Sequence, residues 1–490
     1  MKQLSISDKP KPTKTTVAQF GTGNFLRGFS CRMIDAANEK GVFDGGVAVI
    51  KNTPHGSIES FAEQSCTYTV ILRGLANGAK SVDRRIIGTV TQVCNPYGEF
   101  DEYLHLATNK DLRFVISNTT EAGIVYDEKD SFDQRPASSF PGKLTQFLYA
   151  RYTRFDGADD CGLIILPTEL IEENGKKLSD CINKLITLWG LPKSFADWVN
   201  NSCIFCNTLV DRIVSGYPAD EAEMLERDLL GYRDKLLVVG EPFGLWVIES
   251  PRYKEIGELF PLDRADMPVV FTDDLRPYAQ QKVRILNGAH TSTALAAYLA
   301  GFDIVSELMA DKTMRSFIEK AVYEEISPTV PLPQDQVKKF ADSVMERFEN
   351  PFLKHKLLSI SLNSVSKWKA RILPSLKDSF RANGSLPSCL TFSLAALLTF
   401  YGSDKQGDGF LIGNYGDRSY EIRDDAFVLS YIAENANKTT EEFAELLLGN
   451  TDFWGEDLNA LGNMTAMITS YMHDIEKFGI AKTIENLLAK

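Results

Sequence analysis

Short apolar runs alternate with helical stretches through the first half of the sequence. Such runs, separated by segments whose apolar residues repeat at helical spacing, are typical of strands that are buried on both faces of a parallel sheet. We expect strands of this kind at residues 17–20, 46–50, 112–117, 162–166 and 236–239. This alternation predicts an α/β fold for the first half of the chain.

The pattern changes after Phe271, where strand-like runs become rare and amphipathic helical patterns dominate. Helices are expected at 321–326, 335–348, 353–372, 386–400 and 443–448. A capping box, Thr439-x-x-Glu442, precedes the last of them and Gly449 follows it, whereas the Gly/Asp-rich stretch 402–416 is expected to be an exposed loop. Because 490 residues exceed one ordinary core, we predict an α/β domain over 1–275 and a mostly α-helical domain over 276–490.

The charge balance limits the partners, since 53 Lys and Arg face 66 Asp and Glu. A net charge of −13 disfavours nucleic acid and anionic membranes, and no apolar stretch is long enough to span a bilayer. The polar segment 1–16 lacks the apolar core of a secretory signal. Eight scattered cysteines, with Cys203-x-x-Cys206 as the one close pair, predict buried, reduced thiols and no metal site. These features indicate a cytoplasmic enzyme with a small-molecule substrate.

A glycine turn follows the first predicted strand, where the sequence reads VAQFGTGNFLRGF from Val17 to Phe29. Gly21 and Gly23 would let the backbone turn sharply and approach a pyrophosphate. The third glycine is Gly28, two positions later than the usual dinucleotide fingerprint, so the residues alone leave an ordinary strand-to-helix turn open. The second strand ends in Ile50-Lys51-Asn52 without a ribose-binding acid, which leaves NAD and NADP open and favours Lys51 as a solvated surface charge.

One predicted helix, 274–299, carries Lys282, Asn287 and His290. At α-helical spacing His290 lies about 80° and Asn287 about 140° from Lys282, so the three share one broad face. A lysine, an amide and an imidazole together could deliver a proton and bind the developing oxyanion when a carbonyl is reduced. The alternative is a surface lysine and an Asn-Gly helix break. Asn207 and Glu121 are further candidates, the latter just after a predicted strand, where α/β ligands bind.

These motifs together resemble the polyol-specific long-chain dehydrogenase family, which includes mannitol dehydrogenase. The matching stretches are Gly21–Phe29, Ser117–Gly123, Asn207–Ile213 and Lys282–His290, where K-x4-N-x2-H is complete. The resemblance implies a Rossmann-like N-terminal domain, a helical C-terminal domain, an active site between them and zinc-independent, NAD-dependent chemistry. It also implies that Lys282 is the general acid and base, that Asn207 and Asn287 support it, and that His290 binds substrate hydroxyls.

The implied NAD site comprises the glycine turn and the ends of the neighbouring strands, namely Phe20, Gly21, Gly23, Asn24, Phe25, Lys51, Asn118 and Glu121. Within the family, the stretches 68–75 and 323–330 are most similar to the members that interconvert tagaturonate and altronate. The resemblance places Lys367 in the substrate pocket, but Ser359 stands where mannitol-specific members carry an arginine.

The expected helix 353–372 has a polar stripe at four-residue spacing: His355, Ser359, Asn363, Lys367 and Arg371. Because a ketouronate carries a carboxylate, an acidic protein needs local cations to bind it. We therefore predict that Lys367 pairs with this carboxylate, with His355 or Arg371 as a helper, although a solvated helix face explains the stripe equally well.

Three alternatives remain open at this point. The same chemistry could act on fructuronate or on mannitol and fructose. A non-redox uronate epimerase could keep the fold and a tightly held nicotinamide, and a non-catalytic sugar-binding relative is a third alternative, although the complete Lys–Asn–His set argues against it. The sequence leaves the oligomeric state and the metabolic direction undetermined.

Overall fold

The computed structural model describes residues 2–4, 9–76, 78–120 and 122–489. The chain divides into two compact units. The first comprises Met1–Arg73 and Lys80–Leu275, and the second comprises Gly74–Ala79 and Arg276–Lys490. The short segment 74–79 thus belongs with the second unit although the sequence on both of its sides belongs to the first.

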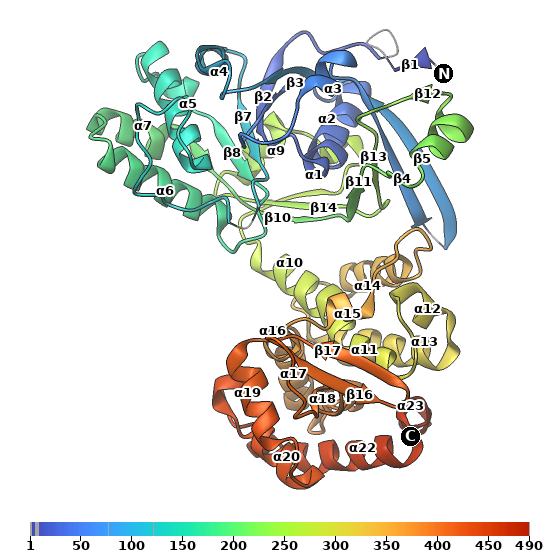
Figure 1. Ribbon diagram of the computed structural model, residues 1–490. Coiled ribbons are helices and arrows are strands. Elements are labelled where there is room, and N and C mark those ends of the chain that lie inside the picture. The colour runs from blue at the N-terminus through green and yellow to red at the C-terminus, as the bar shows by residue number, and fades with distance from the viewer. Residues whose placement is uncertain (1, 5–8, 77, 121, 490) are drawn as a thin grey trace. The chain divides into compact units, whose positions relative to one another are not determined.

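A parallel six-stranded sheet forms the centre of the first unit, with the strand order β6-β3-β2-β7-β8-β9 (Figure 1). Its strands are β2 (Thr15–Phe20), β3 (Gly46–Ile50), β6 (Val90–Cys94), β7 (Phe114–Ser117), β8 (Ile164–Pro167) and β9 (Ile204–Phe205). When these six strands are numbered in chain order, they lie in the order 3-2-1-4-5-6 of a Rossmann domain. The predicted α/β class with a Rossmann-like first domain is confirmed.

Both faces of this sheet are buried, which explains the continuous apolar runs. One face packs against a group of helices that gathers on one side of the unit (Figure 1): α4 (Phe100–Ala107), α5 (Phe140–Arg154), α6 (Asn174–Leu188) and α7 (Lys193–Ser202). The other face packs against α1 (Asn24–Gly28), α2 (Ser30–Glu39), α9 (Tyr253–Leu259) and β14 (Leu245–Glu249).

Four of the five predicted strands lie in the six-stranded sheet, and the fifth does not. Residues 238–240 form β13, which pairs with β4 in a second sheet of order β11-β13-β4-β5. Besides β14, the strands before residue 276 that lie outside the central sheet are β1 (Lys2–Gln3), β4 (Tyr68–Ala76), β5 (Ala79–Ile87), β10 (Asn207–Asp211), β11 (Val214–Gly216), β12 (Tyr232–Arg233), β13 (Val238–Gly240) and β15 (Val269–Thr272). Two short helices, α3 (Glu59–Glu63) and α8 (Ala222–Leu225), complete the first unit.

The second unit is mostly helical, as predicted. Its helices are α10 (Arg276–Gln281), α11 (Gly288–Leu299), α12 (Val305–Ala310), α13 (Lys312–Glu319), α14 (Gln334–Phe348), α15 (Leu357–Ile360), α16 (Ser364–Arg371), α17 (Leu373–Asn383), α18 (Ser388–Tyr401), α19 (Ala426–Asn435), α20 (Thr440–Leu448), α21 (Thr451–Trp454), α22 (Met464–Phe478) and α23 (Ile480–Leu488). The capping box at Thr439 and Glu442 is present. The prediction of a loop over 402–416 is partly wrong, because β16 (Leu411–Tyr415) forms a hairpin with β17 (Arg418–Ile422).

The single helix predicted over 353–372 is also wrong. The chain forms α15 and α16 as separate helices, with Asn363 between them in the left-handed region at φ 53°. The backbone N–H of Ser364 donates to the Tyr401 hydroxyl, and that of Val365 donates to Asp424. These partners satisfy the first turn of a new helix, so α16 starts there instead of continuing α15.

All eight cysteines are free, and all but Cys161 are buried. Burial raises the pKa of Cys203 and of Cys206 to about 12, so both thiols are protonated at neutral pH. The prediction that the thiols are buried is thus confirmed for seven of the eight. Within the described ranges, every helix is too short or too polar to span a lipid bilayer.

Candidate active site

The order of the central sheet reverses between β2 and β7, and ligands of open α/β sheets bind at such a switch point. Gly21 follows β2 with φ 130°, and a Cβ on it would lie 3.2 Å from the carbonyl oxygen of Asn118, which follows β7. The two loops are therefore in close contact. A residue with a side chain at position 21 would have an unfavourable backbone conformation and a tight contact with Asn118. A Cβ on Gly23 would meet no other atom within 4 Å, so the backbone there stays open to a ligand.

The other residues of the glycine turn have different roles. The side chain of Phe20 is fully buried against Tyr103 and Phe140, so only its backbone can face a ligand. Phe25 stacks on Phe29 with ring centroids 4.9 Å apart. Asn24 accepts a hydrogen bond from the Arg27 guanidinium, which fixes the amide at the start of α1. The turn is therefore held in place by its own side chains.

A buried carboxylate that the sequence did not point to organises the loop after β7. Glu169, 2% exposed, accepts hydrogen bonds from the Ser117 hydroxyl at 3.0 Å and from the Thr119 N–H and hydroxyl at 2.9 Å. Asn118 in turn donates to the Thr168 carbonyl at 3.1 Å. Burial raises the pKa of Glu169. The available signal in the sequence was an acid three residues after the predicted strand 162–166. Glu121 lies outside the described residues.

Lys51 is not the solvated surface charge that the sequence favoured. It is 8% exposed, and its ammonium donates to the carbonyl of Pro54 at 3.2 Å. The sequence favoured exposure because lysine follows a strand here, but the chain folds back over it at Pro54. After strand β3 the chain thus forms a turn in which the buried Lys51 side chain is hydrogen-bonded to the backbone.

Asn207 begins β10 in the first unit, and both ends of its amide are engaged. The amide nitrogen donates to Glu249 at 2.7 Å, and the amide oxygen accepts from the backbone N–H of Lys176 at 3.2 Å. The second oxygen of Glu249 accepts from the N–H of Leu275 at 2.9 Å. Glu249 was not predicted; it lies opposite Asn207 in the β10–β14 pair, which only the fold reveals. Since an amide nitrogen has two protons, one N–H of Asn207 remains for a ligand.

A π-helical turn between α10 and α11 in the second unit begins at Lys282 and ends at Asn287. The predicted helix is continuous here, but its α-helical spacing is wrong. A π turn closes between residues i and i+5, so Lys282 and Asn287 lie about one turn apart on one side instead of about 140° apart. Arg284 anchors the turn through Asp378 at 2.7 Å and the Thr329 carbonyl at 2.8 Å. π turns occur frequently at functional sites.

His290 lies one helical turn beyond Asn287 in a partly buried aromatic setting. Its ring stacks on Phe348 with centroids 4.2 Å apart and meets the ring of His355 edge-on at 5.0 Å. Burial, and then the neighbouring charge of His355, lowers the pKa of His290 well below its ordinary value. The nearby charges of Arg347 and Arg371 act in the same direction on this pKa. His290 is therefore neutral at pH 7 and can donate one hydrogen bond and accept another.

The predicted carboxylate-binding residues come from two segments instead of one helix. His355 precedes α15, whereas Lys367 and Arg371 lie one turn apart on α16. Arg371 donates to the Thr291 hydroxyl at 3.3 Å, beside His290, and Lys367 donates to the Ile360 carbonyl at 3.0 Å. Burial lowers the pKa of His355, Lys367 and Arg371, and the charge of Arg371 lowers that of Lys367 further. The two neutral imidazoles of His290 and His355 and the two cations Lys367 and Arg371 are together called the basic cluster.

The neutral histidines of the basic cluster predict a pH dependence of stability. In the unfolded chain both take up a proton below about pH 6.5, whereas burial keeps their pKa values lower in the folded chain. Because the unfolded chain then binds more protons, the free energy of unfolding should fall as the pH drops below about 6.5. Melting temperatures across this range should show a shallower decline for His290→Asn, whereas His105→Asn, at an exposed site, should follow the wild type. If the melting temperatures of all three proteins fell equally steeply with pH, the lowered pKa of folded His290 would be contradicted.

Among the described residues, no three His, Cys, Asp or Glu side chains gather as a metal ion would require. The switch point of the first unit offers open backbone to an extended anionic ligand. The second unit offers a lysine, an amide and a neutral imidazole beside cations.

Two family models match most of the chain. The model described as "Mannitol dehydrogenase Rossmann domain" matches residues 15–258, and the model described as "Mannitol dehydrogenase C-terminal domain" matches residues 274–476. The chain is 40% identical over 495 positions to proteins named "Altronate oxidoreductase" from Escherichia coli O7:K1 and Shigella flexneri. Each alignment covers 99% of this chain and 100% of the relative.

Two solved structures resemble the fold over its whole length. D-sorbitol dehydrogenase in substrate-free form matches with a TM-score of 0.79 at 20% identity, covering 99% of this chain and 100% of that one. The ternary complex of Pseudomonas fluorescens mannitol 2-dehydrogenase with NAD and D-mannitol matches with a TM-score of 0.65 at 19% identity, covering 100% of both. At this identity the likeness establishes the fold alone.

Proposed function

The chain belongs to the mannitol dehydrogenase family and is an oxidoreductase, and from this premise we propose that it interconverts tagaturonate and altronate with NAD(H). The family resemblance drawn from the sequence motifs is confirmed. The observation that carries the choice of substrate is the 40% identity, over 99% of the chain, with altronate oxidoreductases. The basic cluster supports it, since a uronate brings a carboxylate that neutral polyols lack.

The proposed cofactor is NAD(H), because the loops after β2 and β7 can accommodate a dinucleotide. Gly23 presents open backbone, and Gly21 allows the loop after β2 to pass against the loop after β7. This arrangement suits a dinucleotide pyrophosphate, and a mannitol 2-dehydrogenase of the same fold was solved with NAD. Bound there, NADH would supply the hydride for reduction of the ketone. The backbone of Phe20, Gly21 and Gly23 would face the cofactor.

Lys282 is the proposed proton donor for the alcohol that forms in reduction and the proton acceptor in oxidation. Asn287, about one π turn away, and the remaining N–H of Asn207 would donate to the reacting oxygen and stabilise its developing charge. Neutral His290 would bind a substrate hydroxyl as donor or acceptor. Each residue thus supplies a group that carbonyl reduction requires.

The basic cluster would bind the substrate carboxylate. Lys367 donates one hydrogen bond to the Ile360 carbonyl, so two of its N–H groups remain for a ligand, and Arg371 keeps guanidinium donors beyond its bond to Thr291. Two cations one turn apart on α16 can bind one carboxylate, since charge-assisted hydrogen bonds are about twice as strong as neutral ones. We assign Lys367 as the main partner, with Arg371 or His355 as its helper.

A screen of NADH oxidation over tagaturonate, fructuronate and fructose tests the proposal. We expect the highest kcat/KM with tagaturonate and the lowest with fructose, which has no carboxylate. Preference for fructuronate would assign the same chemistry to that substrate, and preference for fructose would assign a mannitol dehydrogenase. Conversion of a uronate without net consumption of NADH would instead indicate an epimerase. The free state of all eight cysteines supports a reducing, cytoplasmic location.

A further inference from the structure

The π turn that carries Lys282 is attached to the rest of the second unit by a residue near its middle. Arg284 lies two positions after Lys282, and its side chain is 13% exposed. One nitrogen of its guanidinium, Nη1, donates to Asp378 on α17 at 2.7 Å and to the Thr329 carbonyl at 2.8 Å. Hydrogen bonds from a charged donor are about twice as strong as neutral ones. Arg284 therefore connects the turn to two segments outside its own helix.

Both acceptors of Arg284 are held in place by α17. Asp378 belongs to this helix. Thr329 ends the 3₁₀ turn Ser327–Thr329, and its hydroxyl donates to the hydroxyl of Ser375 at 3.2 Å. Ser375 is fully buried and also lies on α17. The carboxylate and the carbonyl that bind Arg284 are thus fixed relative to one helix, and the π turn is fixed to them.

The π turn depends on such contacts because its own sequence does not require it. The stretch KVRILN at 282–287 has the composition of an ordinary helix, and π turns are rare. With α-helical spacing, Lys282 and Asn287 would point about 140° apart, whereas a π turn places them on one side. Both groups are proposed to act on one substrate oxygen. A displacement of about 1 Å in such a site can cost about 100-fold in rate.

We infer that Arg284 is a positioning residue, which keeps the π turn closed through Asp378 and the Thr329 carbonyl so that Lys282 and Asn287 reach the same substrate oxygen. The inference rests on the proposed function in taking Lys282 as the proton donor. Arg284 acts through the turn and not on the substrate, because its Nη1 is directed at α17 and at the 3₁₀ turn. Its removal should therefore change kcat and leave the Kd of NADH unchanged.

Arg284→Met removes both hydrogen bonds and keeps an unbranched side chain. With the substrate of highest kcat/KM in the screen, we expect kcat to fall about 10- to 100-fold, while the Kd of NADH stays within about twofold. Arg284→Lys should lose less than about tenfold, because an ammonium can still donate to these acceptors. The matched control is Arg381→Met. Arg381 is 68% exposed and donates to the other oxygen of Asp378 at 3.0 Å, so kcat should stay within about twofold.

A double variant shows whether Arg284 acts through Lys282. Groups that act as a unit lose their effects together, so Arg284→Met should cost at most about threefold in kcat when it is added to Lys282→Ala. An arginine that only stabilised the fold would lower kcat by the same factor with and without Lys282, together with the melting temperature, and this result would overturn the inference.

A milder variant keeps the test decisive if Arg284→Met does not fold. Asp378→Asn changes a carboxylate that is 35% exposed and should lower kcat about three- to tenfold through the weaker bond to Arg284. Wild-type kcat in Asp378→Asn and in Arg284→Met, with activity lost in Lys282→Ala, would overturn the positioning role alone. Near-normal turnover of Lys282→Ala would instead contradict the proposed proton donor, and the inference would be overturned with it.

Discussion

Replacing Lys282 with alanine should lower kcat for tagaturonate reduction by at least about 100-fold, the usual effect of removing a general acid. The alcohol formed at the ketone carbon needs a proton, and Lys282 is the proposed donor in the π turn between α10 and α11. The Kd of NADH should stay at the wild-type value because the glycine turn is unchanged. Stopped-flow or steady-state NADH oxidation, together with NADH fluorescence titration, measures both quantities.

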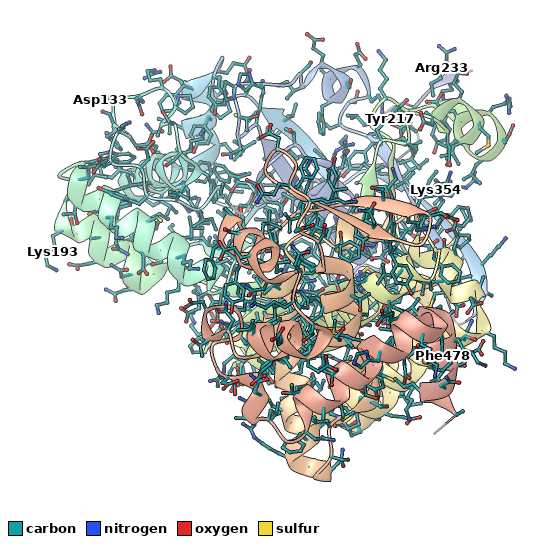
Figure 2. All side chains as sticks on the ribbon, turned by 60° about the horizontal axis from the view of Figure 1, so that its bottom comes forward. Asp133, Lys193, Tyr217, Arg233, Lys354 and Phe478 are labelled. Atoms are coloured by element: carbon teal, nitrogen blue, oxygen red, sulfur yellow. The ribbon has the colours of Figure 1, made fainter. Side chains whose placement is uncertain are left out.

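A matched control and a pH profile make this test specific. Lys193 lies at the start of α7 and extends from the surface, as Figure 2 shows, with a side chain 86% exposed. Lys193→Ala should therefore keep wild-type kcat. If Lys282 moves the proton, the limb of the pH profile of kcat/KM that reports this group should disappear in Lys282→Ala. Near-normal turnover with an unchanged profile would assign the proton transfer to another group.

The parts of the fold that depend on local sequence could be predicted. Four of the six strands of the central sheet are recognisable as apolar runs because both of their faces are covered, whereas β6, which is partly exposed, and the two-residue β9 are not. The turn at Gly21 needs a residue that tolerates φ 130°. The strand at 236–239 was also recognised, but its sheet was not, since strand pairing with β4 joins residues far apart in the sequence.

The wrong predictions for the second unit concern features that tertiary contacts determine. No local signal ends the apolar pattern of 353–372, and the break at Asn363 depends on hydrogen bonds from α16 to Tyr401 and Asp424. The π turn at Lys282 likewise has the composition of an ordinary helix. Even so, Lys367 and Arg371 keep their predicted spacing, because both lie on α16 after the break.

The two acids that orient candidate site residues, Glu169 and Glu249, could not be predicted from the sequence motifs. Glu169 and Glu249 each bind a residue that the motifs had pointed to, Thr119 and Asn207 respectively. Both acids are distant in sequence from these partners and become their neighbours only through parallel or antiparallel strand pairing. The sequence thus indicates which groups could do the chemistry, and the fold determines which groups orient them.

Lys367→Met should raise KM for tagaturonate by roughly 30-fold to several thousand-fold, the equivalent of losing about 2–5 kcal/mol from a buried charged pair. The chain has a net charge of −13, so the carboxylate depends on the few cations near it. Fructose carries no carboxylate, and its KM should change far less. Arg371→Met should have the same sign with a smaller effect, because Arg371 is proposed as the helper.

The control for this prediction lies on the same helix. Lys369 is two residues further along α16 and faces Gly455, whose Cβ position would lie 3.3 Å from its Nζ, so it points away from Lys367. Lys369→Met should leave KM for both substrates near the wild-type value. Lys367 also donates to Ile360 at the end of α15, which gives it a second, structural task. If that task dominated, Lys367→Met would impair tagaturonate and fructose by equal factors and lower the melting temperature, and the carboxylate would have to be bound by other residues.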